Sequence, residues 1–228
     1  PDHDAQGARL MELPRRPAAV IFDLDGLLFD TESLYQEAIM AAAADVGQEM
    51  TPAIFHSMIG RPWLLTRAFL VEHYGSSFPV DDFRAAWNRH FEVIVETRLA
   101  VKPGTHELLD ALDALGLPRG IATSSSHKTV QHHLGAHGLG GRFHQIVASG
   151  DYAAGKPAPD PYLLAAKRLG VAPTLCLALE DSHNDVRSAA AAGMMTIMVP
   201  DLLEATEEIS GLCTFVVRDL HVVRRLLV

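Results

Sequence analysis

The chain has 228 residues, of which 48% are hydrophobic, and its formal net charge is −9. This composition is typical of a folded protein with one large domain, or with a core and a smaller insertion, and not of a disordered chain. The acidic balance argues against nucleic acid or an anionic membrane as the main partner, because both bind basic surfaces. No apolar run reaches the roughly 20 residues of a membrane span.

The chain begins with a polar segment, residues 1–17, which we expect to be a loose leader because it lacks the apolar stretch of a secretory signal. The two cysteines, Cys176 and Cys213, are far apart in the sequence, and Cys176 lies in an apolar run that predicts a buried, inert thiol. Without a disulfide framework, a reducing cytoplasm is the simplest expected location.

Six short apolar runs are predicted to be strands, and amphipathic helical stretches lie between most of them. The runs are, in chain order, AAVIFD (18–23), RGIATS (119–124), HQIVAS (144–149), LCLALE (175–180), MTIMVP (195–200) and CTFVV (213–217). Several of the helical stretches end at glycine, which commonly caps a helix C-terminus. Strands that alternate with helices predict an α/β fold, a three-layer, Rossmann-like parallel sheet.

One long stretch interrupts this alternation. Between the first and second predicted strands, apolar residues recur at spacings of three and four, which indicates amphipathic helices and no strand. We therefore predict a discontinuous α/β core, residues 1–30 and 100–228, with a helical cap inserted at residues 31–99.

Polar and charged residues follow four of the predicted strands. Ligands of a parallel α/β sheet bind beyond the carboxyl ends of its strands, so these residues are candidates for one site: Asp23, Asp25, Thr123, Ser124, Lys156, Glu180 and Asp181. Four carboxylates and one ammonium sum to about −3, and each close pair of like charges costs roughly 4 kcal/mol at an effective dielectric of about 20. A bound cation would offset that repulsion, and hard oxygen ligands suit Mg²⁺.

The four motifs DLDG, the strand-end Thr123, GKPAPDPY and EDSHND occur in the order found in the haloacid dehalogenase-like hydrolase superfamily. The sequence resembles that family over nearly its whole length, in the branch that carries a small helical cap after the first motif. The phosphatases of that branch hydrolyse phosphomonoesters with Mg²⁺. The resemblance therefore implies a phosphatase that acts on a small phosphorylated metabolite, with no nucleic acid or membrane partner, and it favours a monomer.

Catalytic roles follow from the resemblance. Asp23 matches the nucleophile that attacks phosphorus and forms an aspartyl-phosphate, which is covalent catalysis by a carboxylate. Asp25 matches the general acid and base, which protonates the leaving alcohol and then activates water. Lys156 matches the cation that steadies both Asp23 and the transferring phosphoryl group.

Binding roles follow in the same way. Thr123 and the Ser124 backbone match phosphate ligands, and Asp181 matches a Mg²⁺ ligand with Glu180 beside it. Asp23 and the main-chain carbonyl of Asp25 complete the metal set that the resemblance implies. Arg61 occupies the place of a cap loop that faces the active site in the family; it is either a substrate contact or an ordinary arginine at a helix start.

Alternatives remain within and outside this family. A phosphosugar mutase of the β-phosphoglucomutase type shares the motifs, but the family's mutases carry a cap histidine soon after the first motif, where this chain has Leu34 and Tyr35. The segments GLLFDTESLY, IATSS and GMMTIMVPD resemble family members that act on pseudouridine 5′-phosphate and on sugar phosphates. A non-enzymatic phosphoacceptor module also combines strand-end acids with Thr and Lys, but it needs no residue like Asp25.

The role of Asp185, four residues after Asp181, stays open at this point. It is either a supporting carboxylate of the site or an ordinary acid in a first helical turn.

Overall fold

The computed structural model describes residues 11–59 and 63–228. Within these ranges the chain divides into two compact units. One comprises the chain up to Leu24 together with Pro103–Val228, and the other comprises Asp25–Lys102. Most of the predicted leader (residues 1–10) and Arg61 lie outside the described residues.

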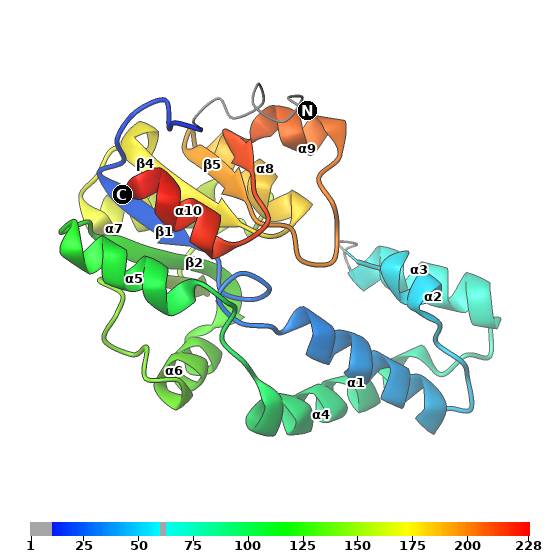
Figure 1. Cartoon of the computed structure of the whole chain (residues 1–228). Coiled ribbons are helices and arrows are strands. Elements are labelled where there is room, and N and C mark those ends of the chain that lie inside the picture. Colours follow the sequence, from blue (N-terminus) through cyan, green and yellow to red (C-terminus); the bar gives the residue numbers. More distant parts are fainter. Residues whose placement is uncertain (1–10, 60–62) are drawn as a thin grey trace, which may run out of the picture. The chain divides into compact units, whose positions relative to one another are not determined.

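The first unit is a parallel β-sheet between helices (Figure 1). Its strands are β1 (Ala19–Phe22), β2 (Arg119–Ser126), β3 (Gln145–Ser149), β4 (Cys176–Glu180), β5 (Met195–Met198) and β6 (Phe215–Val216). Its helices are α5 (Thr105–Ala114), α6 (His127–Ala136), α7 (Asp160–Leu169), η1 (Pro173–Leu175), α8 (His183–Ala191), α9 (Glu207–Leu212) and α10 (Leu220–Leu227). Five of these strands lie within predicted runs, and β2 begins with its run and extends two residues beyond it to Ser126. The predicted fold class is confirmed.

The sheet order is β3-β2-β1-β4-β5-β6, with every neighbouring pair parallel. This is the doubly wound order, in which the connections reverse direction between β1 and β4. All residues of β1 and β4 are buried, as expected for parallel strands that are covered on both faces. The carboxyl ends of β1 and β4 therefore flank the point at which α/β proteins of this topology bind ligands.

The core on one side of the sheet combines alternate residues of β1 and β4 with α7 and α8. Its largest member is Tyr162, on α7, which is 0% exposed. Cys176 lies in the same cluster, where burial raises the pKa of its thiol to about 11. That environment agrees with the prediction of an inert thiol.

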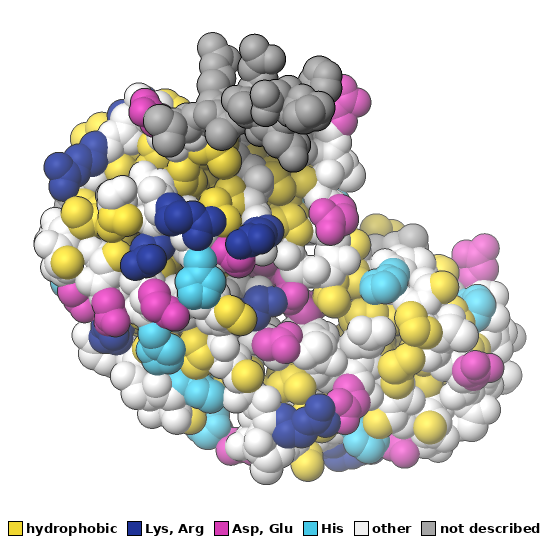
Figure 2. All heavy atoms as spheres, in the orientation of Figure 1, with side chains coloured by type: hydrophobic (Ala, Val, Ile, Leu, Met, Phe, Trp, Pro, Cys, Tyr) yellow, Lys and Arg dark blue, Asp and Glu magenta, His cyan; other side chains and the backbone are white. Residues whose placement is uncertain are grey.

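Helices α5 and α10 lie side by side in front of the sheet (Figure 1). Leu220 and Val223 of α10 are buried, whereas Arg224 and Arg225 are exposed, and Figure 2 shows basic side chains gathered over this helix. Gly104, just before α5, has a φ of +88°, and a Cβ there would lie 2.8 Å from the His221 backbone nitrogen. The close approach of the two helices therefore requires glycine at this position.

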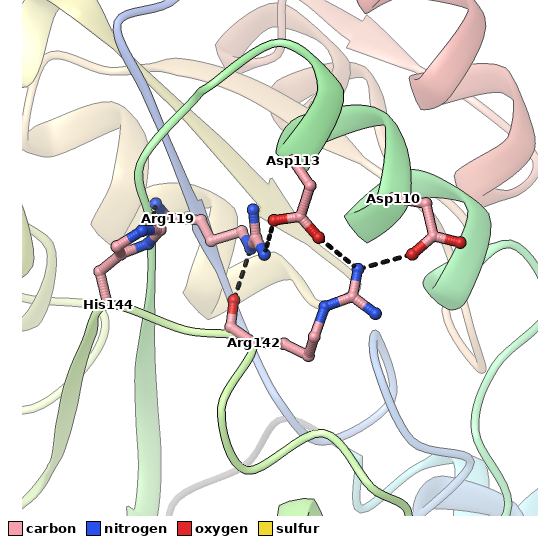
Figure 3. A network of polar contacts seen from close by, with 5 residues as sticks. All are labelled: Asp110, Asp113, Arg119, Arg142 and His144. Atoms are coloured by element: carbon pink, nitrogen blue, oxygen red, sulfur yellow. Dashed lines mark hydrogen bonds and ion pairs between the residues drawn. The ribbon is translucent and has the colours of Figure 1, made fainter.

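A polar network lies at the amino end of β2 (Figure 3). The Arg119 side chain, 4% exposed, forms an ion pair with Asp113 of α5 and donates a hydrogen bond to the Arg142 carbonyl. Arg142 in turn forms ion pairs with Asp110 at 2.7 Å and with Asp113 at 2.9 Å. The network thus ties α5 to the chain segment that enters β3.

The second unit is helical among its described residues. It contains α1 (Glu32–Asp45), α2 (Pro52–His56), α3 (Trp63–Tyr74) and α4 (Val80–Arg98), and none of its described residues belongs to a named strand. Helices α1 and α4 pack together through aromatic rings: Tyr35 stacks on Phe91 at 3.8 Å between centroids and meets Trp87 edge-on at 5.8 Å. Trp87 and Phe91 therefore contribute to the packing of this unit.

Candidate active site

The candidate site lies at the carboxyl edge of the sheet, where β1 and β4 end. Asp23 directly follows β1, and its backbone N–H extends the sheet by donating to the Leu179 carbonyl at 3.1 Å. Glu180 is the last residue of β4, and Asp181 follows it. Because the two strands are paired in register, their terminal carboxylates are brought together.

Lys156 joins these carboxylates from the loop between β3 and α7. Its Nζ lies 2.6 Å from Asp23 Oδ1, 2.9 Å from Asp185 Oδ2 and 3.7 Å from Glu180 Oε1. The Lys156 side chain is only 2% exposed, and the Asp23 side chain 4%. Ion pairs that are this well shielded from water interact far more strongly than surface pairs.

The electrostatics of the cluster are dominated by burial and by crowded negative charge. Burial alone would lower the pKa of Lys156, but the carboxylates of Asp185, Asp23 and Glu180 outweigh it and hold that pKa well above its ordinary value. Burial raises the pKa of Glu180 well above its ordinary value, and Lys156 offsets only part of this shift while the neighbouring carboxylates add to it. The lysine is thus a cation, and Glu180 would ionise readily only beside further positive charge.

Four carboxylates of this site have the arrangement of a metal centre. Asp23, Glu180, Asp181 and Asp185 each offer an oxygen, and these oxygens lie within 4.8 Å of one another. Neither carboxylate oxygen of the buried Glu180 has a hydrogen-bond partner among the described residues. A set of hard oxygen donors with orphaned acceptors fits Mg²⁺, which binds carboxylates and keeps part of its water shell.

Thr123 and Ser124 lie on β2, the strand next to β1. Phe22, the last residue of β1, pairs with Ile121 of β2. Thr123, two residues after Ile121, therefore lies near the end of β1, which Asp23 directly follows. Thr123 is buried, its Oγ1 accepts the Ser125 N–H at 3.0 Å, and its carbonyl accepts the Tyr152 hydroxyl at 3.0 Å. Ser124 is exposed, and β2 extends beyond it to Ser126, the N-cap of α6.

Asp25 belongs to the second unit, two residues along the chain from Asp23. A tight turn follows it, in which Gly26, with a φ of +83°, donates its N–H to the Phe29 carbonyl at 2.9 Å. A side chain at a positive φ would be strained, which explains the glycine of DLDG. In the same unit, burial and the nearby Asp25 and Glu32 carboxylates raise the pKa of Tyr35 to about 12.

Sequence reasoning left the role of Asp185 open, and the structure places it in the cluster. Asp185 lies in the first turn of α8 and forms the 2.9 Å ion pair with Lys156. The sequence signal for Asp185 was its spacing, because it follows Asp181 by four residues at a helix start, which is about one helical turn. Arg61, the remaining candidate, lies outside the described residues.

Comparison with known proteins decides the family. The profile of the haloacid dehalogenase-like hydrolases matches residues 17–193. The chain belongs to this family. It is 36% identical to the Bacillus subtilis protein named "Putative phosphatase YhcW", over 82% of this chain and 86% of that protein. It is also 36% identical to the Drosophila melanogaster protein named "Probable pseudouridine-5'-phosphatase", over 82% and 83% of the two chains.

Solved structures of the family agree with the fold. A Thermotoga maritima protein described as a putative β-phosphoglucomutase matches with a TM-score of 0.76 and 28% identity, over 92% of this chain and 99% of that chain. The predicted family and enzyme class, a haloacid dehalogenase-like hydrolase with relatives named as phosphatases, are confirmed. In the part of the chain that the structure describes, no helix has the length and apolar character needed to cross a membrane.

Proposed function

We propose that this protein is a Mg²⁺-dependent phosphomonoester hydrolase that acts on a small phosphorylated metabolite through an aspartyl-phosphate intermediate. The observation that carries the proposal is the buried cluster at the carboxyl edge of β1 and β4, where the Lys156 ammonium lies 2.6 Å from Asp23 among four carboxylates. The family membership supports the same chemistry.

Asp23 is the proposed nucleophile, because it ends a buried strand and is held by a cation. The ion pair with Lys156 fixes one oxygen of its carboxylate, Oδ1, so that the other can attack phosphorus. When phosphorus is attacked, negative charge builds on the phosphoryl oxygens, and the Lys156 ammonium is already in place to stabilise it.

Asp25 is the proposed acid and base. Two residues span at most about 7 Å of chain, so its carboxylate starts within reach of a group bound at Asp23. It would protonate the leaving alcohol and then take a proton from the attacking water. Thr123 and the Ser124 backbone, on β2 shortly before α6, are the proposed phosphate ligands, because the N–H groups at the nearby helix start attract anions.

Asp23, Asp181 and the Asp25 carbonyl are the proposed Mg²⁺ ligands, with Glu180 beside them. When bound, Mg²⁺ would supply positive charge that neutralises the phosphate oxygens and the crowded carboxylates. Asp185 and Glu180 contact Lys156 and would keep its ammonium directed at Asp23.

The substrate class proposed is a sugar phosphate or a nucleoside phosphate, which are the classes in the names of the similar proteins. Hydrolysis is favoured over the phosphosugar mutase reaction because Leu34 and Tyr35 stand where the mutases have a histidine. Leu34 is buried, and Tyr35, with its pKa raised to about 12, stays protonated at neutral pH. A cytoplasmic location and a monomeric state stay predictions, as does a substrate contact by Arg61.

The decisive experiment measures phosphate release by the purified chain with Mg²⁺. The panel contains p-nitrophenyl phosphate, pseudouridine 5′-phosphate, other nucleoside phosphates and several sugar phosphates. We expect turnover that requires Mg²⁺ and disappears in Asp23→Asn, while Asp82→Asn, an exposed carboxylate of α4, leaves it unchanged. Turnover that persists in Asp23→Asn would overturn the nucleophile assignment.

The mutase alternative is tested with β-glucose 1-phosphate and its bisphosphate activator. A hydrolase releases inorganic phosphate and glucose, whereas a mutase forms glucose 6-phosphate. Mass spectrometry of acid-quenched protein should find the phosphate adduct on the peptide that carries Asp23. Glucose 6-phosphate as the main product would replace the hydrolase proposal with the mutase.

A further inference from the structure

The Lys156 ammonium has an aromatic neighbour in addition to its three carboxylate contacts. Its Nζ lies over the ring of Tyr162, 5.1 Å from the ring centroid. Tyr162 is on α7, six residues after Lys156, and is 0% exposed. The ammonium is therefore bounded by carboxylates and by the face of a buried aromatic ring.

The ring is a fixed surface, whereas a lysine side chain is intrinsically flexible. Tyr162 is part of the core cluster formed with β1, β4 and α8, so its ring has no freedom to move away. The loop that carries Lys156 is also anchored, because the buried Ser188 hydroxyl donates to the Ala158 carbonyl at 2.6 Å. Both the loop and the ring thus limit where the ammonium can lie.

An aromatic face attracts a cation through its negative π-electron density, and the attraction is strongest where water is excluded. The Lys156 side chain is 2% exposed, so this condition is met. The carboxylates of Asp23, Glu180 and Asp185 compete for the same ammonium, and the ring adds an attraction that restricts it to one position among them.

The hydroxyl of Tyr162 takes no visible part in this arrangement. Its oxygen is buried and has no hydrogen-bond partner among the described residues. An unpaired buried hydroxyl is unfavourable, and phenylalanine would avoid that cost. The contact with Lys156 therefore depends on the ring and not on the hydroxyl.

We propose that Tyr162 is a positioning residue whose ring face holds the Lys156 ammonium against Asp23. The inference rests on the proposed phosphoryl-transfer function, for which Lys156 must be in place before phosphorus is attacked. A displaced ammonium would stabilise the transition state less while leaving phosphate binding by other groups largely intact. The effect is accordingly expected on kcat and not on KM.

The test compares three replacements of the same residue. Tyr162→Phe keeps the π face, Tyr162→Leu removes it, and 3,4,5-trifluorophenylalanine at position 162 keeps the ring shape but withdraws its π-electron density. We expect Tyr162→Phe to retain kcat within about twofold. We expect the trifluoro and Leu variants to lose about tenfold in kcat or more, with KM changed by no more than about twofold. The isosteric fluorinated variant decides the question if Tyr162→Leu fails to fold.

A second readout does not depend on enzymatic turnover. Protons above an aromatic face resonate upfield, so the Lys156 ε-methylene signal, assigned by its loss in Lys156→Met, should be shifted upfield in the wild type and in Tyr162→Phe. The shift should disappear in Tyr162→Leu. If the wild type shows the shift but hydrolyses no phosphomonoester, the proposed function fails and the contact stands. Either of two results would overturn the positioning role of Tyr162. One is a trifluorophenylalanine variant whose kcat equals that of Tyr162→Phe. The other is a Tyr162→Phe variant whose kcat is as low as that of Tyr162→Leu.

Discussion

Two charged clusters lie at opposite ends of the same parallel sheet. At the amino end, the guanidinium groups of Arg119 and Arg142 face the carboxylates of Asp110 and Asp113, so their charges balance (Figure 3). At the carboxyl end, the carboxylates of Asp23, Glu180, Asp181 and Asp185 gather around the Lys156 ammonium.

The difference lies in charge balance and not in burial alone. The Arg119 side chain is as well shielded as that of Asp23, yet the charges of its network are paired by ion pairs within the chain itself. The carboxyl-end cluster keeps an excess of negative charge and orphaned oxygens on Glu180. A balanced cluster stabilises the fold, whereas an unbalanced one is suited to binding a cation and an anionic substrate.

The largest effect is expected at the carboxyl end. Lys156→Met removes the ammonium that contacts Asp23, and we expect phosphate release to fall by about 10³-fold, since a single preorganised group of this kind supplies roughly 10²–10³ in rate. Steady-state kinetics with Mg²⁺ checks the change. Lys167→Met, an exposed lysine of α7, is the control and should keep wild-type activity. Loss of less than tenfold in Lys156→Met would remove this residue from the proposed mechanism.

The second effect is stabilisation by Mg²⁺. A ligand that binds the folded state at about 100 times its Kd stabilises it by roughly 2.7 kcal/mol, and the unbalanced cluster is where Mg²⁺ should bind. Thermal unfolding should show a rise in the midpoint with added MgCl₂. The rise should shrink in Asp181→Asn and persist in Asp110→Asn. An equal rise in both variants would mean that the ion acts elsewhere.

The third effect concerns the amino end. Arg119→Met leaves the Arg142 carbonyl and Asp113 without their buried donor, and we expect a loss of about 2 kcal/mol in the free energy of unfolding. Urea denaturation measures it. Activity per folded molecule should stay at the wild-type value, because the network lies at the far end of β2 from the candidate site. A large loss of activity with unchanged stability would contradict the structural role of this cluster.

The smallest effect is the dependence of stability on pH through Asp113. The hydrogen bond from Arg119 is the main reason that the pKa of Asp113 lies below its ordinary value. A carboxyl with a lowered folded-state pKa stabilises the protein above its unfolded-state pKa of about 4, and this contribution is lost as pH falls through the folded-state pKa. Stability of the wild type should therefore fall more steeply below about pH 4 than that of Asp113→Asn. Parallel curves for the two proteins would show that this carboxylate is not coupled to folding.

Much of the fold could be predicted from local patterns. Each of the six apolar runs coincides with a strand, although β2 extends beyond its run to Ser126, and the three- and four-residue spacing between the first two strands predicted helices, because periodicity reflects which face of an element is buried. The strand order, with β1 and β4 adjacent in the centre, could not be predicted from periodicity. Strand order depends on contacts between residues more than 150 positions apart, such as Ala19 and Cys176.

For the candidate site, the sequence by itself determined the types and order of the residues. It identified Asp23, Lys156, Glu180 and Asp181 as strand-end groups and predicted that their excess negative charge needs a cation. Their catalytic roles stay predictions, and so does the role of Asp25.

Only the tertiary structure decided which groups touch. The pairing of β1 with β4 brings Asp23 to Glu180, the first turn of α8 adds Asp185 to Lys156, and the core places the Tyr162 ring beneath the ammonium. The physical reason is that electrostatic and π interactions act over a few ångströms of space. Sequence spacing sets that distance within one helix or strand, but between elements only the packing of the sheet and its helices can set it.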